Sequence, residues 1–281
     1  MAGQTDKKSV LRIFIKHLLR RVKSSDVPGV AAQMAYFFLL ALFPLLIFMV
    51  TLLGYLPMDP NEVFNVIKDF APSDSLSLVQ DTLQEVTSNQ NGGLLSVGIL
   101  GTIWSASNAM NAVIKGLNYA YDVKETRPFY IARGLSILLT FAFIFVIAVM
   151  LILQVFGQQI GELAFEFLGM GDEFLALWTW IRFLLPPVVL YLVFAGLYYL
   201  APNLKIKYVT VVPGAIFATI GWIITSLGFS FYVNNFGNYS ATYGSIGGVI
   251  ILMIWLYLSA MIILVGGEIN ALRNDQKRGA A

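Results

Sequence analysis

Long apolar runs alternate with short polar segments along most of the chain. A helix needs about 20 predominantly apolar residues to cross the hydrocarbon core of a bilayer. Six runs meet this length, at about residues 30–56, 94–114, 131–156, 181–200, 209–233 and 246–267. The pattern therefore predicts an all-α, polytopic membrane protein with six transmembrane helices.

Two of the polar stretches have a helical period of their own. Residues 7–23 carry an apolar stripe opposite the basic side chains Lys8, Arg12, Lys16, Arg20 and Lys23. A basic amphipathic helix next to a membrane span is typical of an anchor on an anionic lipid surface, and we prefer this to nucleic-acid binding, which we do not expect. Residues 60–70 and 73–88 predict two further amphipathic helices, outside the membrane.

These segments divide the chain into three parts. Residues 1–29 form a basic, cytoplasmic amphipathic segment, and residues 271–281 form a basic cytoplasmic tail. Residues 30–270 form the six-helix transmembrane domain, with outer loops at 57–93 and 157–180. The second of these loops is expected to be a linker with one short amphipathic piece.

Charge predicts the orientation of the bundle. With both termini in the cytoplasm, all of the 18 Lys and Arg residues except Lys68 and Arg182 lie on the inner side or at the inner ends of the helices. Most of the 16 Asp and Glu residues then lie outside. This agrees with the positive-inside rule and favours six spans over five or seven.

The amino-acid composition argues against several kinds of catalytic and metal-binding site. The chain is 58% hydrophobic and only 12% charged, whereas soluble domains carry about 25% charged residues. It has no Cys and a single His, His17, so the usual disulfide, zinc and haem ligand sets are absent. Neither a Walker-type phosphate loop nor a nucleophile paired with a base is evident. We therefore expect no cofactor, no metal and no enzymatic activity.

What remains is a set of polar groups within apolar helices. In the second span small and polar residues recur every three or four positions, so they share one face that we expect to look at protein or water. The candidate polar path consists of Gln33, Ser105, Asn108, Asn111, Lys115, Asn118, Glu268 and Asn270. Either these groups line a solute or headgroup path, or they are hydrogen bonds that hold helices together. Candidate hinges are Pro44, Pro186, Pro187 and Pro213.

Two of these groups are charged and end their spans on the same predicted side. Lys115 ends the second span, and Glu268 ends the sixth. An opposite charge nearby offsets the cost of burying either one. We therefore predict that they pair, or share a network with Gln33, Asn111 and Asn270. The alternative is that each reaches water separately.

Four blocks of the chain resemble a known family. They are AAQMAYFFLLALFPLLI, GTIWSASNAMNAVIKGLNYAYDV, RPFYIARG and YGSIGGVIILMIWLYLSAMIILVGGEINA. They look like the conserved blocks of the YihY/BrkB family of bacterial membrane proteins, and the match runs from about Val27 to Ala271. The resemblance implies six helices in the bacterial cytoplasmic membrane and roles in envelope integrity and serum resistance. It also brings an old ribonuclease BN label, widely regarded as a misassignment, and no established catalytic residue.

The resulting expectation is a transporter or a translocator of lipids or amphiphiles, without an ATPase of its own. Its expected partners are anionic lipids of the inner leaflet and a lipid-like or small-molecule substrate, and homo-oligomers are left open. A non-transporting scaffold for envelope biogenesis is the first alternative. A membrane-bound ribonuclease is the second.

Overall fold

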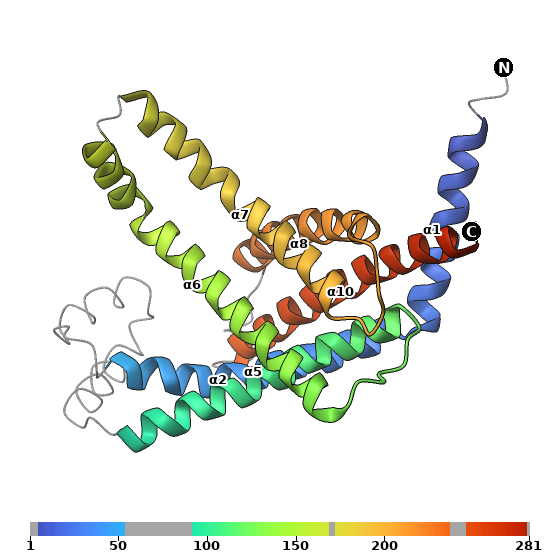
Figure 1. Cartoon of the computed structure of the whole chain (residues 1–281), viewed down its shortest axis with the longest axis horizontal. Coiled ribbons are helices and arrows are strands. Elements are labelled where there is room, and N and C mark those ends of the chain that lie inside the picture. Colours follow the sequence, from blue (N-terminus) through green and yellow to red (C-terminus); the bar gives the residue numbers. More distant parts are fainter. Residues whose placement is uncertain (1–4, 54–91, 169–171, 237–245, 280–281) are drawn as a thin grey trace. The chain divides into compact units, whose positions relative to one another are not determined.

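The computed structural model describes residues 5–53, 92–168, 172–236 and 246–279 (Figure 1). All regular structure in these ranges is helical. The helices are α1 (Thr5–Ser24), α2 (Val27–Leu53), α5 (Gly92–Ala120), α6 (Phe129–Leu168), α7 (Asp172–Leu200), α8 (Tyr208–Phe236) and α10 (Ile246–Gly279). The amphipathic helices expected over residues 60–70 and 73–88 lie outside the described residues.

Among the described helices, six are long and apolar enough to cross a membrane. They are α2, α5, α6, α7, α8 and α10, in the order that hydropathy predicts. The span in α5 is the most enclosed, with 39% of its residues buried, and α8 follows with 33%. The small side chains of α5 explain its high buried fraction, because they let neighbouring backbones approach closely.

One segment that was predicted to be a linker is helical in the structure. The segment 157–180 was expected to be a linker with one short helical piece. Instead α6 continues to Leu168 and α7 already begins at Asp172, leaving only residues 169–171 between them outside the described ranges. The acidic residues that suggested a loop are compatible with a helix that extends beyond the hydrocarbon core.

The chain separates into two compact units. The smaller unit, Phe37–Ala109, contains the second part of α2 and the first part of α5. Within it, the side chain of Thr102 is buried and donates a hydrogen bond to the Gly98 carbonyl, 2.7 Å away. A Cβ atom built on Gly101 would lie 3.5 Å from Pro44 Cβ. Small residues on α5 thus face α2 where its proline lies.

The larger unit contains residues 1–36 and 110–281. Its helices α8 and α10 pack along each other, and two tryptophans are interleaved between them. Trp222 donates to Ser259 at 3.1 Å and Trp255 donates to Ser226 at 3.3 Å, while the two rings meet edge to face with centroids 5.8 Å apart. Each indole N–H therefore has a partner on the other helix, as apolar surroundings require.

A sharp break separates α1 from α2. Asp26 has a φ of 45°, in the left-handed region that non-glycine residues rarely adopt except for Asn and Asp. Its carbonyl accepts a hydrogen bond from the Val30 N–H, which opens α2. The break therefore lies in the turn at residues 25–26. It sends α1 in a new direction from α2, with its C-terminal turn against α10 (Figure 1).

Candidate functional site

One arginine joins three helices of the larger unit. Arg21 lies in the last turn of α1 and donates through Nε to Glu268 Oε2 of α10 at 2.8 Å. Its Nη1 donates to Asp275 Oδ2 at 2.7 Å, and its Nη2 donates to the Ala120 carbonyl at 2.9 Å. That carbonyl ends α5 and would otherwise lack an intrahelical partner. We call Arg21, Glu268, Asp275 and the Ala120 carbonyl the Arg21 cluster.

The two acids of the Arg21 cluster differ in environment. The Glu268 side chain is fully buried, whereas that of Asp275 is 56% exposed. Burial disfavours the charge of Arg21, but hydrogen bonds and charges from Glu268 and Asp275 outweigh it and raise the pKa of Arg21. The guanidinium therefore stays protonated and supplies the counter-charge for the buried carboxylate.

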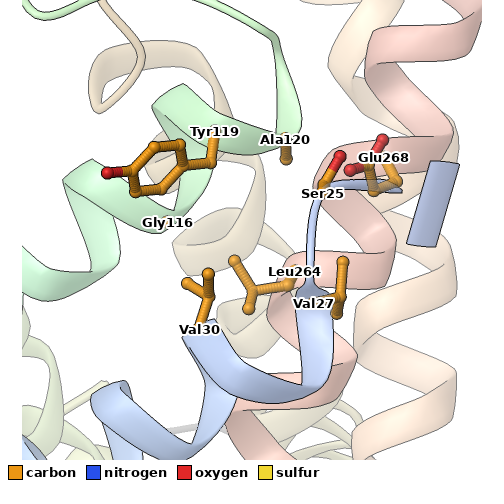
Figure 2. Close-up of a pocket in the computed structure, with 8 residues that line it drawn as sticks. All are labelled: Ser25, Val27, Val30, Gly116, Tyr119, Ala120, Leu264 and Glu268. Carbon is orange, nitrogen blue, oxygen red and sulfur yellow. The ribbon is translucent and has the colours of Figure 1, made fainter. Parts of the chain in front are cut away.

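A narrow pocket opens beside this carboxylate (Figure 2). It is lined by Ser25, Val27, Val30, Gly116, Tyr119, Ala120, Leu264 and Glu268. It leaves no room for a sphere the size of a water molecule. Glu268 Oε1 is nevertheless buried, and it has no hydrogen-bond partner among the described residues. A buried carboxylate oxygen normally has one, so Glu268 is only half satisfied in this arrangement.

Asn270 forms a second polar contact at the same end of α10. Its Oδ1 accepts a hydrogen bond of 2.7 Å from the backbone N–H of Gly214, next to Pro213 in α8. In the part of the chain that the structure describes, both Asn270 Nδ2 and the Tyr121 hydroxyl are buried without a hydrogen-bond partner. Burial raises the pKa of Tyr121, and the neighbouring Asn270 amide offsets part of this although the two groups lie outside hydrogen-bonding geometry. Tyr121 is therefore neutral at physiological pH.

Four side chains connect the α5–α6 loop to the α7–α8 loop. Asn118 accepts the Asn203 N–H at 2.8 Å and donates to Glu125 Oε2 at 2.9 Å. Arg127 binds Glu125 with two nitrogens, each at 2.7 Å, and also donates to the Ala201 carbonyl at 2.9 Å. We call Asn118, Glu125, Arg127 and Asn203 the loop clamp. It holds the ends of α5 and α7 in register.

The loop clamp is expected to loosen in acid. The hydrogen bond from Arg127 is the main cause that lowers the pKa of Glu125 below its usual value. A carboxyl with a lowered folded-state pKa stabilises the fold above its unfolded pKa, about 4.3, and this stabilisation is lost as the pH falls through the folded value. A nitroxide attached at exposed position 124 should therefore become more mobile below about pH 4.

Glu125→Gln is the matched control for this titration. The amide keeps the shape of the side chain but cannot lose a proton in this range. The spin label in this variant should show the same mobility at pH 3 as at pH 7. An equal acid transition in both proteins would assign the change to another group.

The predicted polar residues fall into three groups by burial. Asn118, Glu268 and Asn270 are buried and bonded across helices or loops, as described above. Gln33 and Lys115 are exposed, and Ser105, Asn108 and Asn111 are half-buried. Ser105 and Asn108 belong to the smaller unit and the other six to the larger one. Whether any of them contacts a substrate stays a prediction.

The predicted pair of Lys115 and Glu268 is wrong. Glu268 pairs with Arg21, and Lys115 takes part in none of the ion pairs among the described residues. Lys115 instead has an exposed side chain. The sequence placed both groups at the same depth, but depth does not specify which face of α5 looks at α10. Among the described residues, neither Gln33 nor Asn111 hydrogen-bonds to Glu268, whose bonded oxygen faces α1.

The candidate hinge prolines and the basic residues of the N-terminal segment all lie in helices. Pro44 lies inside α2, Pro186 and Pro187 lie inside α7, and Pro213 lies inside α8, and each helix continues through its proline. Their use as hinges stays a prediction. On α1, the basic side chains Arg12, Lys16, Arg20 and Lys23 are exposed, as the amphipathic pattern predicts. The Lys8 side chain lies outside the described residues.

The sequence pattern did not single out Arg21 as a candidate site residue. Arg21 lies three residues after Leu18 and seven after Phe14, so it falls on the apolar face of α1 rather than on the basic side. A charge in an apolar stripe signals a buried partner, because an unpaired one would be costly there. The loop clamp residues Glu125, Arg127 and Asn203 carry no comparable signal, since polar residues in loops are common.

Comparison with known proteins identifies the family. The profile of the family described as "Virulence factor BrkB" matches residues 18–281. The chain belongs to the BrkB family. A BrkB-family relative from Bacillus subtilis, described as a ribonuclease-like protein, YfkH, is 54% identical over 94% of this chain and 96% of its own length.

More distant relatives carry only a membrane description. A UPF0761 membrane protein of Aliivibrio fischeri is 31% identical over 94% of this chain and 85% of its own length. One from Vibrio parahaemolyticus is 29% identical over 94% of this chain and 83% of its own length. No solved structure matches the chain. The family resemblance read from the sequence blocks is thus confirmed, together with membrane localisation.

Proposed function

We propose that this BrkB-family protein is a transporter of the bacterial cytoplasmic membrane that moves a lipid or other amphiphile. It has no ATPase of its own, and both termini lie in the cytoplasm. The single observation that supports the proposal best is the Arg21 cluster. Its carboxylate, Glu268, is fully buried at the end of a membrane-spanning helix, yet within the described ranges only one of its oxygens has a hydrogen-bond partner.

Ionisable groups in such places are costly, and they commonly mark substrate or ion paths. Arg21 donates to two carboxylate oxygens and one carbonyl oxygen, at 2.7–2.9 Å. A phosphate-bearing headgroup offers the same kind of acceptor and could replace them. In this scheme the substrate competes for Arg21, α1 leaves α10, and the inner end of the bundle opens. The narrow pocket beside Glu268 then corresponds to the closed state.

Transport is testable in proteoliposomes. Fluorescent lipids and small solutes should move faster across membranes that contain the wild-type protein than across empty ones. Glu268→Gln keeps the size of the side chain but removes the charge that holds Arg21, so we expect the rate to fall about tenfold, which corresponds to about 1.4 kcal/mol in the barrier. Asp275→Asn serves as the control, because its partner contact is largely exposed and should contribute little.

A structural scaffold is the second candidate function, and the loop clamp favours it. Asn118 and Asn203 fix two loops, and Asn270 fixes α8 against α10, all through hydrogen bonds that need no substrate. If no lipid or solute moves, and Asn203→Ala impairs the envelope of cells as strongly as Glu268→Gln does, the scaffold replaces the transporter.

The description of YfkH raises ribonuclease activity as a further alternative. RNA hydrolysis needs a nucleophile with a base, or carboxylates gathered around metal ions. Within the described ranges, no three His, Asp or Glu side chains gather in a way that could hold a metal ion. Degradation of RNA by the purified protein, abolished by a single carboxylate substitution, would nevertheless favour this alternative over transport.

A further inference from the structure

An apolar crevice of about 430 Å³ lies between α6 and α7. Its lining runs along α6 from Leu139 to Leu153 and along α7 from Leu185 to Leu200, and it includes Met110 of α5. Every lining residue has an apolar side chain or is glycine. It shares no residue with the Arg21 cluster or the loop clamp, so it is a separate feature of the larger unit.

The size and shape of the crevice restrict what can occupy it. Its volume falls within the range of about 300–1,000 Å³ that is usual for small-molecule sites. Fifteen residues separate Leu185 from Leu200, which is roughly 22 Å along a helix and most of the 30 Å hydrocarbon core. A helix of that length, about 10–12 Å across, occupies roughly 2,000 Å³ and is too large. A slender chain fits.

Its chemistry excludes a polar occupant. The lining side chains offer neither a donor nor an acceptor, so a polar ligand would lose its hydrogen bonds to water without replacement. A hydrocarbon chain makes no hydrogen bonds in the bilayer, so it loses none on entering the crevice. A flexible acyl chain therefore matches both the shape and the polarity of the crevice.

One end of the crevice is basic. Leu200 leads directly into the 201–207 loop, where Lys205 and Lys207 are exposed. Arg133 lies six residues before Leu139, roughly 9 Å along α6. Of the two acids in the neighbouring 121–128 loop, Glu125 is bound to Arg127, and Asp122 is exposed. Tyr199 and Tyr208 meet edge to face here, centroids 6.2 Å apart, as is typical of aromatic residues at the headgroup level.

We propose that this crevice binds one acyl chain of an anionic phospholipid from the surrounding bilayer, with the headgroup at Lys205, Lys207 and Arg133. The crevice supplies shape, and the three cations supply the preference for negative charge. The binding does not depend on transport, and it holds equally if the protein is a scaffold.

Photolabelling tests the site directly. The full-length protein is reconstituted in phosphatidylcholine vesicles with a small fraction of phosphatidylglycerol that carries a diazirine on one acyl chain. After irradiation, mass spectrometry locates the adducts. They should concentrate on 139–153 and 185–200, above the level at the exposed positions Leu138 and Phe217, which lie outside the crevice. This map is measured on the wild-type protein and needs no variant.

A glycine allows the crevice to be filled. Gly196 lines it, and a Cβ atom added there meets nothing within 4 Å. Gly196→Leu should therefore fold normally and reduce crevice adducts to the level of Leu138. Gly228→Leu is the matched control, because Gly228 has equally open surroundings on α8 and does not line the crevice. Its adduct map should equal that of the wild type.

The headgroup preference is measured by competition between unlabelled phosphatidylglycerol and phosphatidylcholine. A Lys near an anionic headgroup contributes about 1 kcal/mol, so Lys205→Gln should lower the preference about fivefold. Arg273→Gln, at an exposed position on α10 outside the crevice, should not change it. Adducts spread evenly over all lipid-facing positions, an unchanged map in Gly196→Leu, or cross-links between two copies through the crevice would each overturn the proposal.

Discussion

Replacing Arg21 with alanine is expected to lower the free energy of unfolding by about 3–5 kcal/mol. The substitution leaves the Glu268 carboxylate fully buried with neither oxygen bonded, and it frees the carbonyl that ends α5. An uncompensated buried charge is among the most destabilising changes a fold can receive. Thermal unfolding in detergent, followed by circular dichroism, measures the loss.

The adjacent Arg20 provides the control. It lies on the exposed side of α1, and it makes none of the ion pairs among the described residues. Arg20→Ala should change stability by no more than about 0.5 kcal/mol. Equal losses in the two variants would show that general helix propensity, rather than the buried pair, decides the result.

A double-mutant cycle isolates the pair itself. Arg21→Ala and Glu268→Ala should each be destabilising, but the double variant should lose much less than their sum, because no charge is then left buried alone. Strict additivity would contradict a direct interaction. The same cycle with Lys115 in place of Arg21 should be additive, since Lys115 is exposed and does not contact Glu268 in the structure.

Gly214→Ala is expected to be the second large effect, with a loss of about 3 kcal/mol, at the upper end of the usual cost of overpacking. An added Cβ atom would overlap the Gly266 carbonyl oxygen and the Asn270 side chain. The Gly266 atom belongs to a helix backbone, so it cannot rotate away, and α8 and α10 must separate. Their separation also breaks the hydrogen bond from the Gly214 N–H to Asn270.

Gly221→Ala, on the same helix, separates this effect from the general consequence of replacing a helical glycine. Its Cβ atom would lie 3.5 Å from Ile262 Cγ2, an ordinary contact. Because alanine reduces the freedom of the unfolded chain, this variant should be unchanged or more stable by about 0.4–1 kcal/mol. Comparable damage in both variants, measured by thermal unfolding, would contradict the close approach at Gly214.

The sequence by itself determined the class of fold. In hydrocarbon, the backbone polar groups of a spanning segment must be hydrogen-bonded internally. A single run of about 20 apolar residues meets this requirement as a helix. The six spans, the basic face of α1 and the break at Asp26 all follow from local periodicity and local chemistry. The enclosure of α5 followed in the same way, from its small side chains.

Tertiary structure decided which polar groups meet. Periodicity placed Glu268 and Lys115 at the same predicted depth, but a pair also requires the two helices to turn those faces toward each other. Helix rotation depends on packing of side chains far apart in sequence, such as Gly214 against Gly266, and no local pattern encodes it. The same holds for Arg21 and Glu268, which lie 247 residues apart and become partners only because α1 folds back on α10.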